Sequence, residues 1–345
     1  MKKVAEILEK AIEDRLIPGA VISVTDEEST IYQKAFGYAH DANKLSMTKS
    51  TIFDLASLTK VVATLPAVLQ LLDQGQLDLD DSVSHYLPQF EENHPDLTLK
   101  HFLTHTSGLQ PEIRFWQQNL SVDEAIDLIA QMKEKKPVGT EVIYSDLNFI
   151  TLGKIVEKIT NMPLDVYTKK FIYEPLEMKD TVFNPAPDIQ NRIAATEYRE
   201  TLNDYQWGTV HDENALHFGG VSGHAGLFST AEDLSKFARM ILNDGHYNGQ
   251  QIISKPSLTL SRKSQTKELN QNRGIGWQLY DPGTFSGQFL SDGIGHTGFT
   301  GTSMWISKEN QYAIILLTNR VHFGRDRNIH RLRKLVHNCL AIGMS

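Results

Sequence analysis

Ser57 and Lys60 are a pair whose residue types and spacing could do chemistry together. Side chains three positions apart lie on one face of a helix, so this hydroxyl and this amine can come within hydrogen-bond reach. A serine is a weak nucleophile until a neighbouring group takes its proton, and a desolvated lysine can take it. The pattern is short and also arises by chance, in which case the serine is a helix N-cap and the lysine a surface cation. Companion motifs elsewhere in the chain decide between the two interpretations.

Two companion motifs follow in order: Tyr-Ser-Asp at 144–146 and His-Thr-Gly at 296–298. With the Ser-x-x-Lys pair, this order resembles the serine β-lactamase and penicillin-binding protein family, in its class C and D-Ala-D-Ala carboxypeptidase branch. That family shows S-x-x-K, Y-x-N and K/H-T-G in sequence. The resemblance extends over roughly residues 5 to 320. Four further stretches carry it, at 53–56, 77–81, 103–109 and 223–229.

The resemblance implies roles for three residues. Ser57 is the nucleophile that forms an acyl-enzyme with a carbonyl substrate, and Lys60 is its activator. Segment 52–56 before the pair has a buried pattern, and desolvation lowers the pKa of a lysine, so we expect Lys60 to be a usable base. Tyr144 is the second proton handler by resemblance. A phenol ordinarily has a pKa near 10 and acts as a base only beside cations, and Lys60 is the cation expected there.

Two residues depart from the family's usual pattern. Asp146 stands where much of the family has asparagine, and an ionised aspartate cannot donate a hydrogen bond to a substrate carbonyl. Asp146 is also expected to favour the charged form of Lys60, which shifts the role of base towards Tyr144. His296 stands where many relatives have lysine, and a histidine is fully charged only below a pKa of about 6.5. We therefore expect recognition of a substrate carboxylate to be weaker or pH-dependent.

The rest of the predicted site lies beside His296. Thr297 is expected to hydrogen-bond the same substrate group, and Gly298 lets the edge strand approach the substrate closely. By resemblance, the backbone N–H groups of Ser57 and Phe299 form the oxyanion hole, in which one donor contributes roughly 3 kcal/mol to catalysis.

Other patterns in the chain are assigned no catalytic role. Segment 105–108 contains His and Ser but resembles a structural turn of the family. The glycine-rich segment 219–226 matches no phosphate-binding motif and is expected to be a tight loop bordering the site. The thirteen histidines show no metal-ligand spacing, so we expect no metal and no other cofactor. The single cysteine, Cys339, lies in an apolar stretch and is expected to be a buried thiol.

The pattern of elements predicts one α/β (α+β) domain over residues 1–345. Strands near both ends of the chain predict an antiparallel sheet flanked by helices, which is the β-lactamase/transpeptidase-like arrangement that the resemblance implies. The α/β lobe is expected to comprise about 1–57 and 205–345, and an inserted, mostly helical lobe about 58–204. Helices are expected at 4–15, 65–72, 122–132 and 326–341, with Pro66 restarting the second; strands are expected at 20–24, 30–36, 276–280, 301–306 and 312–318.

Composition limits the partners. The chain is 40% hydrophobic and 22% charged, as in a globular protein with a substantial core. Its net charge of −8 argues against nucleic acid, which binds basic surfaces. The basic run at 325–334 is interpreted as a solvated helix face. Residues 1–10 lack the apolar core of a signal peptide, and no stretch approaches a membrane span. We expect a cytoplasmic protein as the sequence stands, or an exported, cell-wall-associated one if a leader has been removed.

Several functions compete within this framework. The leading interpretation is a serine hydrolase acting on peptidoglycan-derived peptides, as a D-alanyl-D-alanine carboxypeptidase or a muropeptide amidase, with β-lactams as acylating ligands. Segments 212–215 and 223–227 resemble a bacterial subgroup that includes exo-acting N-acetylmuramoyl-L-alanine amidases. A carboxylesterase or a weak β-lactamase are the alternatives. A catalytically inactive sensor of the same fold is an alternative of another class, although such a module has no physical need for Ser57, Lys60 and Tyr144 together.

Overall fold

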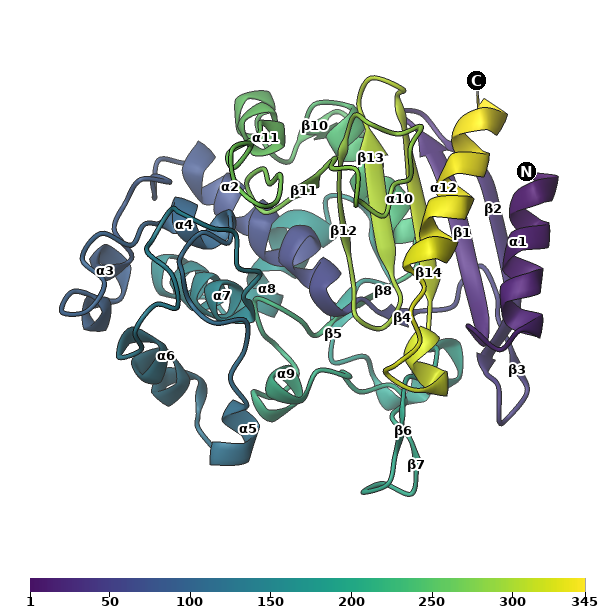
Figure 1. Ribbon diagram of the computed structural model, residues 1–345, viewed down its shortest axis with the longest axis horizontal. Coiled ribbons are helices and arrows are strands. Elements are labelled where there is room, and N and C mark those ends of the chain that lie inside the picture. The colour runs from purple at the N-terminus through teal and green to yellow at the C-terminus, as the bar shows by residue number, and fades with distance from the viewer. Residues whose placement is uncertain (345) are drawn as a thin grey trace.

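A seven-stranded antiparallel sheet forms the centre of the protein, as shown by a computed structural model that describes residues 1–344 (Figure 1). The strand order is β11-β12-β13-β14-β1-β2-β3. The two ends of the chain meet in the middle of this sheet, because β1 pairs with β14 from Ala20 opposite Thr318 to Asp26 opposite Tyr312. The strands are β1 (Gly19–Asp26), β2 (Thr30–His40), β3 (Leu45–Ser46), β11 (Gln278–Leu279), β12 (Ile294–Thr297), β13 (Ser303–Ser307) and β14 (Tyr312–Thr318).

Helices cover both faces of the sheet. Helices α1 (Lys2–Glu13) and α12 (His330–Met344) lie side by side on one face, and α10 (Ala231–Leu242) packs on β1 and β14 from the other (Figure 1). Alternate residues of a strand point to opposite faces. Ile314 therefore lies in the core beneath α1 and α12, while Ile315 lies in the larger core on the other side. Burial of both faces explains why β14 is an unbroken apolar run.

A mostly helical region lies beside the sheet and shares its larger core (Figure 1). Its helices are α2 (Leu65–Asp73), α3 (Val83–Tyr86), α4 (Leu99–Leu103), α5 (Phe115–Gln118), α6 (Val122–Ala130), α7 (Asp146–Thr160) and α8 (Leu164–Thr168). Helices α9 (Glu213–His217) and α11 (Lys255–Arg262) follow later in the chain. The remaining strands are β4 (Phe53–Asp54), β5 (Val182–Phe183) and β8 (Leu227–Ser229), which form one small sheet, and the hairpins β6 (Tyr198–Arg199) with β7 (Asp204–Tyr205) and β9 (His246–Tyr247) with β10 (Gln250–Gln251).

The segment after β4 changes its winding twice before it becomes an α-helix. A 3-10 turn, Ala56–Leu58, is followed by a π-helical turn, Lys60–Thr64, and then by α2. Pro66 lies in the first turn of α2, where a missing N–H costs nothing, so the predicted restart is found. By length and hydropathy alone, Ala56–Asp73 could cross a membrane, which differs from our expectation, but 83% of it is buried inside the protein.

The predicted fold class is confirmed; the differences concern the ends of elements and elements that were not predicted, such as α10. The last helix begins at His330 rather than at 326, and the Asn328 side chain accepts a hydrogen bond from the His330 N–H at this start. Cys339 is half-buried rather than buried. The division into lobes at about 57 and 205 stays a prediction.

Candidate active site

Ser57 and Lys60 are brought together by the 3-10 and π-helical turns rather than by a regular α-helix. The Lys60 Nζ lies 3.2 Å from the Ser57 Oγ. Ala56, just before the serine, has a φ of +46°, which costs free energy in a residue other than glycine. The Asp54 carboxylate accepts a hydrogen bond from the Ala56 N–H at 2.8 Å and so holds this strained residue. The nucleophile therefore follows a backbone kink that its surroundings enforce.

The Lys60 amine is fully buried and bonded in three directions. It donates to the Ser57 Oγ, to Asp146 Oδ1 at 2.6 Å and to the backbone oxygen of His224 at 3.2 Å. Burial lowers the pKa of Lys60, but attraction to Asp146 and Tyr144 outweighs burial and raises the pKa above its ordinary 10.5. Our expectation that desolvation makes Lys60 a ready base was wrong, whereas the expectation that Asp146 favours its charged form agrees with this geometry.

Asp146 is the first residue of α7 and follows the N-cap Ser145. A carboxylate in the first turn interacts favourably with the helix dipole. The Asp146 N–H donates to the Pro111 backbone oxygen at 2.8 Å, and the Ser145 hydroxyl donates to the Gln110 backbone oxygen at 2.6 Å. The loop before α5 thus fixes the start of α7, and with it the carboxylate that holds Lys60.

Tyr144 lies among cations and imidazoles. The Lys60 Nζ is 4.9 Å and the Arg273 Cζ 5.5 Å from the centre of its ring, and the His105 ring lies 4.5 Å away. Within the described chain, the buried Tyr144 hydroxyl has no hydrogen-bond partner. His105 is fully buried, accepts a bond from the Ser145 N–H and has a φ of +57°, so segment 105–108 is a turn that supports Tyr144.

His296 is buried on β12, with its ring 5.8 Å from that of Tyr144. Burial, Arg273 and Lys60 together hold the pKa of His296 well below 6.5. This direction favours a neutral imidazole at physiological pH, which agrees with the expected weaker recognition of a carboxylate and not with the alternative, a charge that varies near pH 6.5. Arg273, 6% exposed and with two unpartnered N–H groups, brings a permanent positive charge to the same place.

Gly298 lies close to the backbone before Ser57, while its predicted approach to the substrate stays a prediction. A Cβ at this position would lie 2.3 Å from the Leu55 backbone oxygen and 2.2 Å from the Thr302 hydroxyl. The close approach is thus to the backbone that leads into Ser57. Thr297, at the end of β12, is half-buried, and Phe299 is 47% exposed with Arg320 above its ring at 4.7 Å. The Phe299 N–H has no backbone partner among residues 1–344, as an oxyanion-hole donor requires.

A histidine–aspartate pair adjoins Lys60 and had no assigned role. His224 Nε2 lies 2.9 Å from Asp212 Oδ1, and the Ser222 hydroxyl lies 2.8 Å from His224 Nδ1. Burial raises the pKa of Asp212, but His224, its hydrogen bonds and Lys60 outweigh burial and lower the pKa below 3.8. Atoms of Asp146, Asp212 and His224 lie within 4.8 Å of one another, a spacing suited to a metal ion, although the charged Lys60 at Asp146 opposes a second cation.

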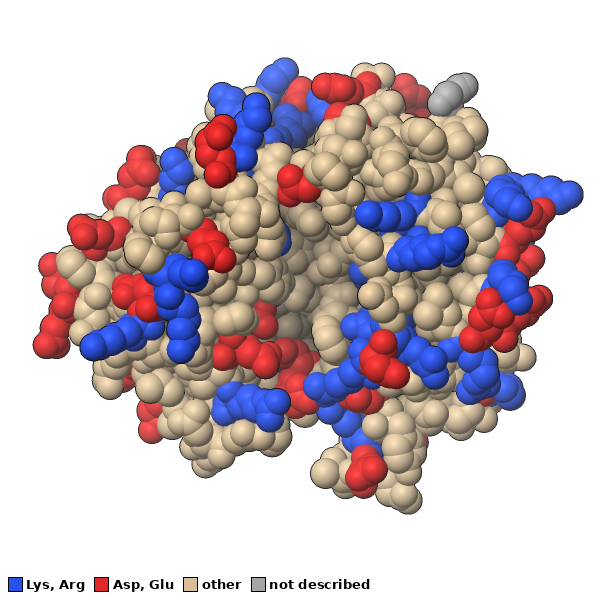
Figure 2. Space-filling view, viewed as in Figure 1, with Lys and Arg blue, Asp and Glu red and all other residues tan. Residues whose placement is uncertain are grey.

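The surface is hollowed where β12 faces α7 and α9 (Figures 1 and 2). Acidic side chains gather along the lower edge of this hollow and basic ones along its right edge (Figure 2). A pocket of about 360 Å³ is lined by 297–299 and by basic residues that include Arg320, Arg325 and Arg333. Asp326 also lines the pocket and attracts Arg320, but among the described residues Arg320 and Arg333 form no salt bridge. Four arginines against one aspartate leave the lining positive, which favours an anionic group.

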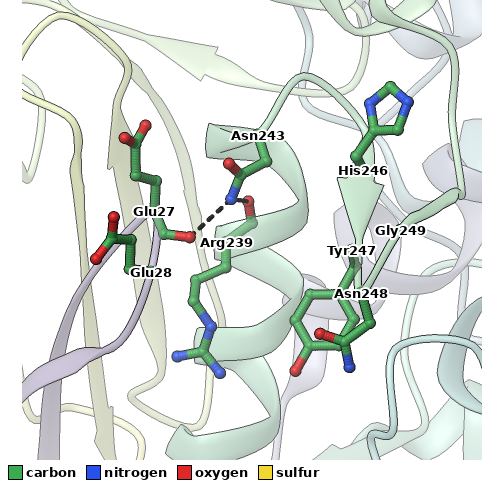
Figure 3. A pocket seen from close by; sticks show the side chains of 8 residues that line it. All are labelled: Glu27, Glu28, Arg239, Asn243, His246, Tyr247, Asn248 and Gly249. Carbon is green, nitrogen blue, oxygen red and sulfur yellow. Dashed lines mark hydrogen bonds between the residues drawn. The ribbon is translucent and has the colours of Figure 1, made fainter.

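A second pocket, of about 340 Å³, lies at the far end of α10 (Figure 3). Its walls include Glu27, Arg239 and His246, and the Asn243 side chain donates across it to the Glu27 backbone oxygen at 2.7 Å. Its lining includes no serine or cysteine.

Ser57, Tyr144 and Asp146 thus surround the Lys60 amine, and His296 on β12 lies beside Tyr144. Sequence reasoning did not assign roles to Asp212, His224 or Arg273. The first two lay in family-like segments, whereas nothing in the sequence around Arg273 marks it.

Comparisons with known proteins agree with this geometry. A family model described as Beta-lactamase matches residues 4–338. Relatives from Salmonella schwarzengrund and Salmonella typhi, each named "Putative D-alanyl-D-alanine carboxypeptidase", are 33% identical over 88% of this chain and 79% of their own length.

Solved structures with the same fold include a class C β-lactamase from Rhodobacter sphaeroides (TM-score 0.79, 21% identity, 99% of this chain and 100% of that one). The octameric penicillin-binding protein homologue from Pyrococcus abyssi has a TM-score of 0.80 at 22% identity, over 99% of this chain and 77% of that one. The protein is therefore a serine hydrolase that belongs to the β-lactamase family.

Proposed function

We propose that the protein hydrolyses peptidoglycan-derived peptides through an acyl-enzyme on Ser57, as a D-alanyl-D-alanine carboxypeptidase or a muropeptide amidase. The observation that carries the proposal is the Lys60 amine, which is buried, charged and 3.2 Å from the Ser57 Oγ. The names of the Salmonella relatives support the carboxypeptidase. Whether the protein acts in the cytoplasm or after export stays a prediction.

The charge state of Lys60 sets the order of proton transfers. A protonated amine cannot accept the serine proton, so Lys60 donates to the Ser57 Oγ and stabilises its negative charge while the oxygen attacks the carbonyl carbon. In its phenolate form, Tyr144 accepts the serine proton, and the phenol so formed passes that proton to the leaving amine as the C–N bond breaks. Water then attacks the acyl-enzyme by the reverse transfers and releases the acid. The N–H groups of Ser57 and Phe299 would hold the oxyanion.

The basic pocket beside Thr297 favours a carboxypeptidase over an amidase. A carboxypeptidase releases an amino acid whose carboxylate needs a positive partner. Because His296 is neutral, Arg320 and Arg333 in the pocket and Arg273 nearby are the charges that remain for this role.

A carboxylesterase is the second candidate. Asp146 cannot donate to a substrate amide, and the neutral His296 removes a charge that many relatives place at this point. An ester without a carboxylate needs neither group. The fold of EstCE1, described as a hydrolase with promiscuous acyltransferase activity, is shared by this chain (TM-score 0.78, 22% identity, 97% of this chain and 98% of that one).

The test is intact-protein mass spectrometry with a penicillin, followed by assays of D-alanine release from a D-Ala-D-Ala peptide. We expect the mass of one ring-opened penicillin on the wild type and none on Ser57→Ala. Ser50→Ala, which changes an exposed serine nearby, should label like the wild type. D-alanine release that depends on Ser57 identifies a carboxypeptidase.

Ester hydrolysis without penicillin adducts or D-alanine release would favour the esterase and contradict the peptide substrate. An inactive sensor would show no turnover of any substrate and would keep its affinity for a ligand after Ser57→Ala.

A further inference from the structure

We propose that His224, held by Asp212 and Ser222, is a positioning residue that fixes the amine of Lys60 for reaction. The inference rests on the proposed acyl-enzyme function. It adds the His224–Asp212 pair, which affects the reaction only by holding Lys60.

The His224 ring is fixed at both nitrogens. Its Nε2 lies 2.9 Å from Asp212 Oδ1, its Nδ1 lies 2.8 Å from the Ser222 hydroxyl, and only 1% of the residue is exposed. Asp212 is itself anchored, because it is the N-cap of α9 and its Oδ1 accepts the Ala215 N–H at 2.8 Å. A ring with a partner at each nitrogen has one orientation, so the backbone that carries it is also fixed.

The backbone at 223–227 is hydrogen-bonded to the segment 57–64, which carries the nucleophile. The His224 oxygen accepts from the Lys60 amine, and the neighbouring Gly223 oxygen accepts from the Thr64 hydroxyl at 2.7 Å. The Leu227 N–H also donates to the Thr59 hydroxyl at 3.2 Å, which adds a further hydrogen bond between the two segments. A Cβ on Gly223 would lie 2.0 Å from a backbone oxygen of α7, so this stretch has no room to slide.

The third hydrogen bond matters because a lysine side chain is long and flexible. An ammonium has three donors, and here Ser57, Asp146 and His224 take one each. Without the His224 oxygen, the amine is left between a carboxylate at 2.6 Å and a hydroxyl at 3.2 Å. The charged carboxylate is the stronger acceptor and would draw the amine away from Ser57. A displacement of about 1 Å in such a site costs roughly 100-fold in rate.

The test measures the rate at which each intact site reacts, with a fluorophosphonate as the probe. The Ser57 Oγ attacks phosphorus and the fluoride leaves together with the serine proton, so the reaction needs nothing from an unidentified substrate. Intact mass spectrometry counts the labelled molecules. The variants are His224→Ala, Asp212→Ala, the double variant and Asp212→Asn, with His85→Ala as an exposed control.

We expect His224→Ala and Asp212→Ala each to slow labelling by about 30- to 100-fold. Full final labelling and an unchanged half-saturating probe concentration are expected with both. The double variant should be no slower than His224→Ala, because the two residues act as one unit. Asp212→Asn should stay within about threefold of the wild type, since asparagine accepts from His224 and caps a helix equally well. If His224→Ala does not fold, Ser222→Ala removes one atom and should slow labelling by about three- to tenfold.

Three results would overturn the inference. A normal rate with fewer labelled sites would show a purely structural role. A raised half-saturating concentration in Asp212→Ala would place Asp212 in contact with the probe. Losses that multiply in the double variant would show that the residues act independently. Failure of the wild type to label at Ser57 would instead overturn the proposed nucleophile itself, and the inference with it.

Discussion

Lys60 keeps a positive charge inside the protein because Asp146, 86 positions along the chain, lies 2.6 Å from its amine. The sequence predicts that Lys60 is desolvated and shows that Asp146 is present, but it does not show that the two meet. Burial alone predicts a lowered pKa for Lys60, whereas the interaction with Asp146 makes the pKa shift upward. This is why the roles suggested by the motifs could be predicted and the charge state of Lys60 could not.

Replacing Asp146 with asparagine should lower the pKa of Lys60. The attraction that raises the pKa is lost while the effect of burial remains. NMR titration of the amine, with ¹³C-methylated lysines and Lys60→Arg for assignment, measures the change. Lys154→Gln, which removes the half-buried lysine that pairs with Asp123, serves as the control. A Lys60 pKa that is unchanged in Asp146→Asn would contradict this account.

Substrate binding should not depend on the titration of His296. Burial and the neighbouring Arg273 and Lys60 hold the pKa of this group well below 6.5, so it is neutral on both sides of that pH. We expect the profiles of kcat/KM for the wild type and His296→Gln to have the same shape between about pH 5.5 and 7.5. An inflection near 6.5 that only the wild type shows would contradict the prediction.

At the scale of elements, β12 and the turn that bears Ser57 are held together through a glycine. Gly298→Ala would place a methyl group 2.3 Å from the Leu55 backbone oxygen and 2.2 Å from the Thr302 hydroxyl, so the strand must move. We expect a loss of about 1–3 kcal/mol in stability and at least tenfold slower acylation of Ser57. Urea unfolding and penicillin acylation rates measure the two effects.

Gly283→Ala is the matched control for this prediction. No atom lies within 4 Å of a Cβ built there, so the substitution should leave both measurements unchanged. Equal behaviour of the two alanine variants would refute the role given to Gly298.

The elements themselves were predicted where the pattern is local. The hairpin of β1 and β2 and the buried run of β14 follow from their apolar, β-branched residues. Helix α10 was not predicted, although Thr230 caps it through the Asp233 N–H and its apolar face covers the sheet. The turns at Ala56–Leu58 and Lys60–Thr64 could not be predicted, because they are tied to distant segments: Asp54, which holds Ala56, accepts the His211 N–H, and Lys60 donates to the His224 oxygen.

The whole molecule should lose stability in mild acid. His322 and His337 are buried, and burial, the largest cause, lowers the pKa of each to about 4. A histidine in the unfolded chain titrates near 6.5. Above that pH the two neutral histidines leave the free energy of unfolding undiminished, and this free energy falls as the pH drops from 6.5 towards 4. The loss amounts to about 3 kcal/mol for each group.

Urea unfolding at pH 7 and pH 4.5 measures this loss. In His337→Gln, the difference in unfolding free energy between the two pH values should shrink, whereas His85→Ala, at an exposed site, should leave it unchanged. An equal difference in all three proteins would refute the assignment.

The two ends of the chain come together on one face of the sheet, where the Met1 nitrogen lies 3.8 Å from a Cβ built on Gly343. Met1 is the N-cap of α1 and Gly343 lies in α12, and these two helices pack side by side (Figure 1). A short linker could therefore join them, and new ends could be opened in the exposed turn between β6 and β7. In such a circular permutant β14 and β1 would be successive strands, with α12, the linker and α1 between them. The fold depends on which strands are neighbours in space, and a permuted gene that still yields an acylated serine would demonstrate it.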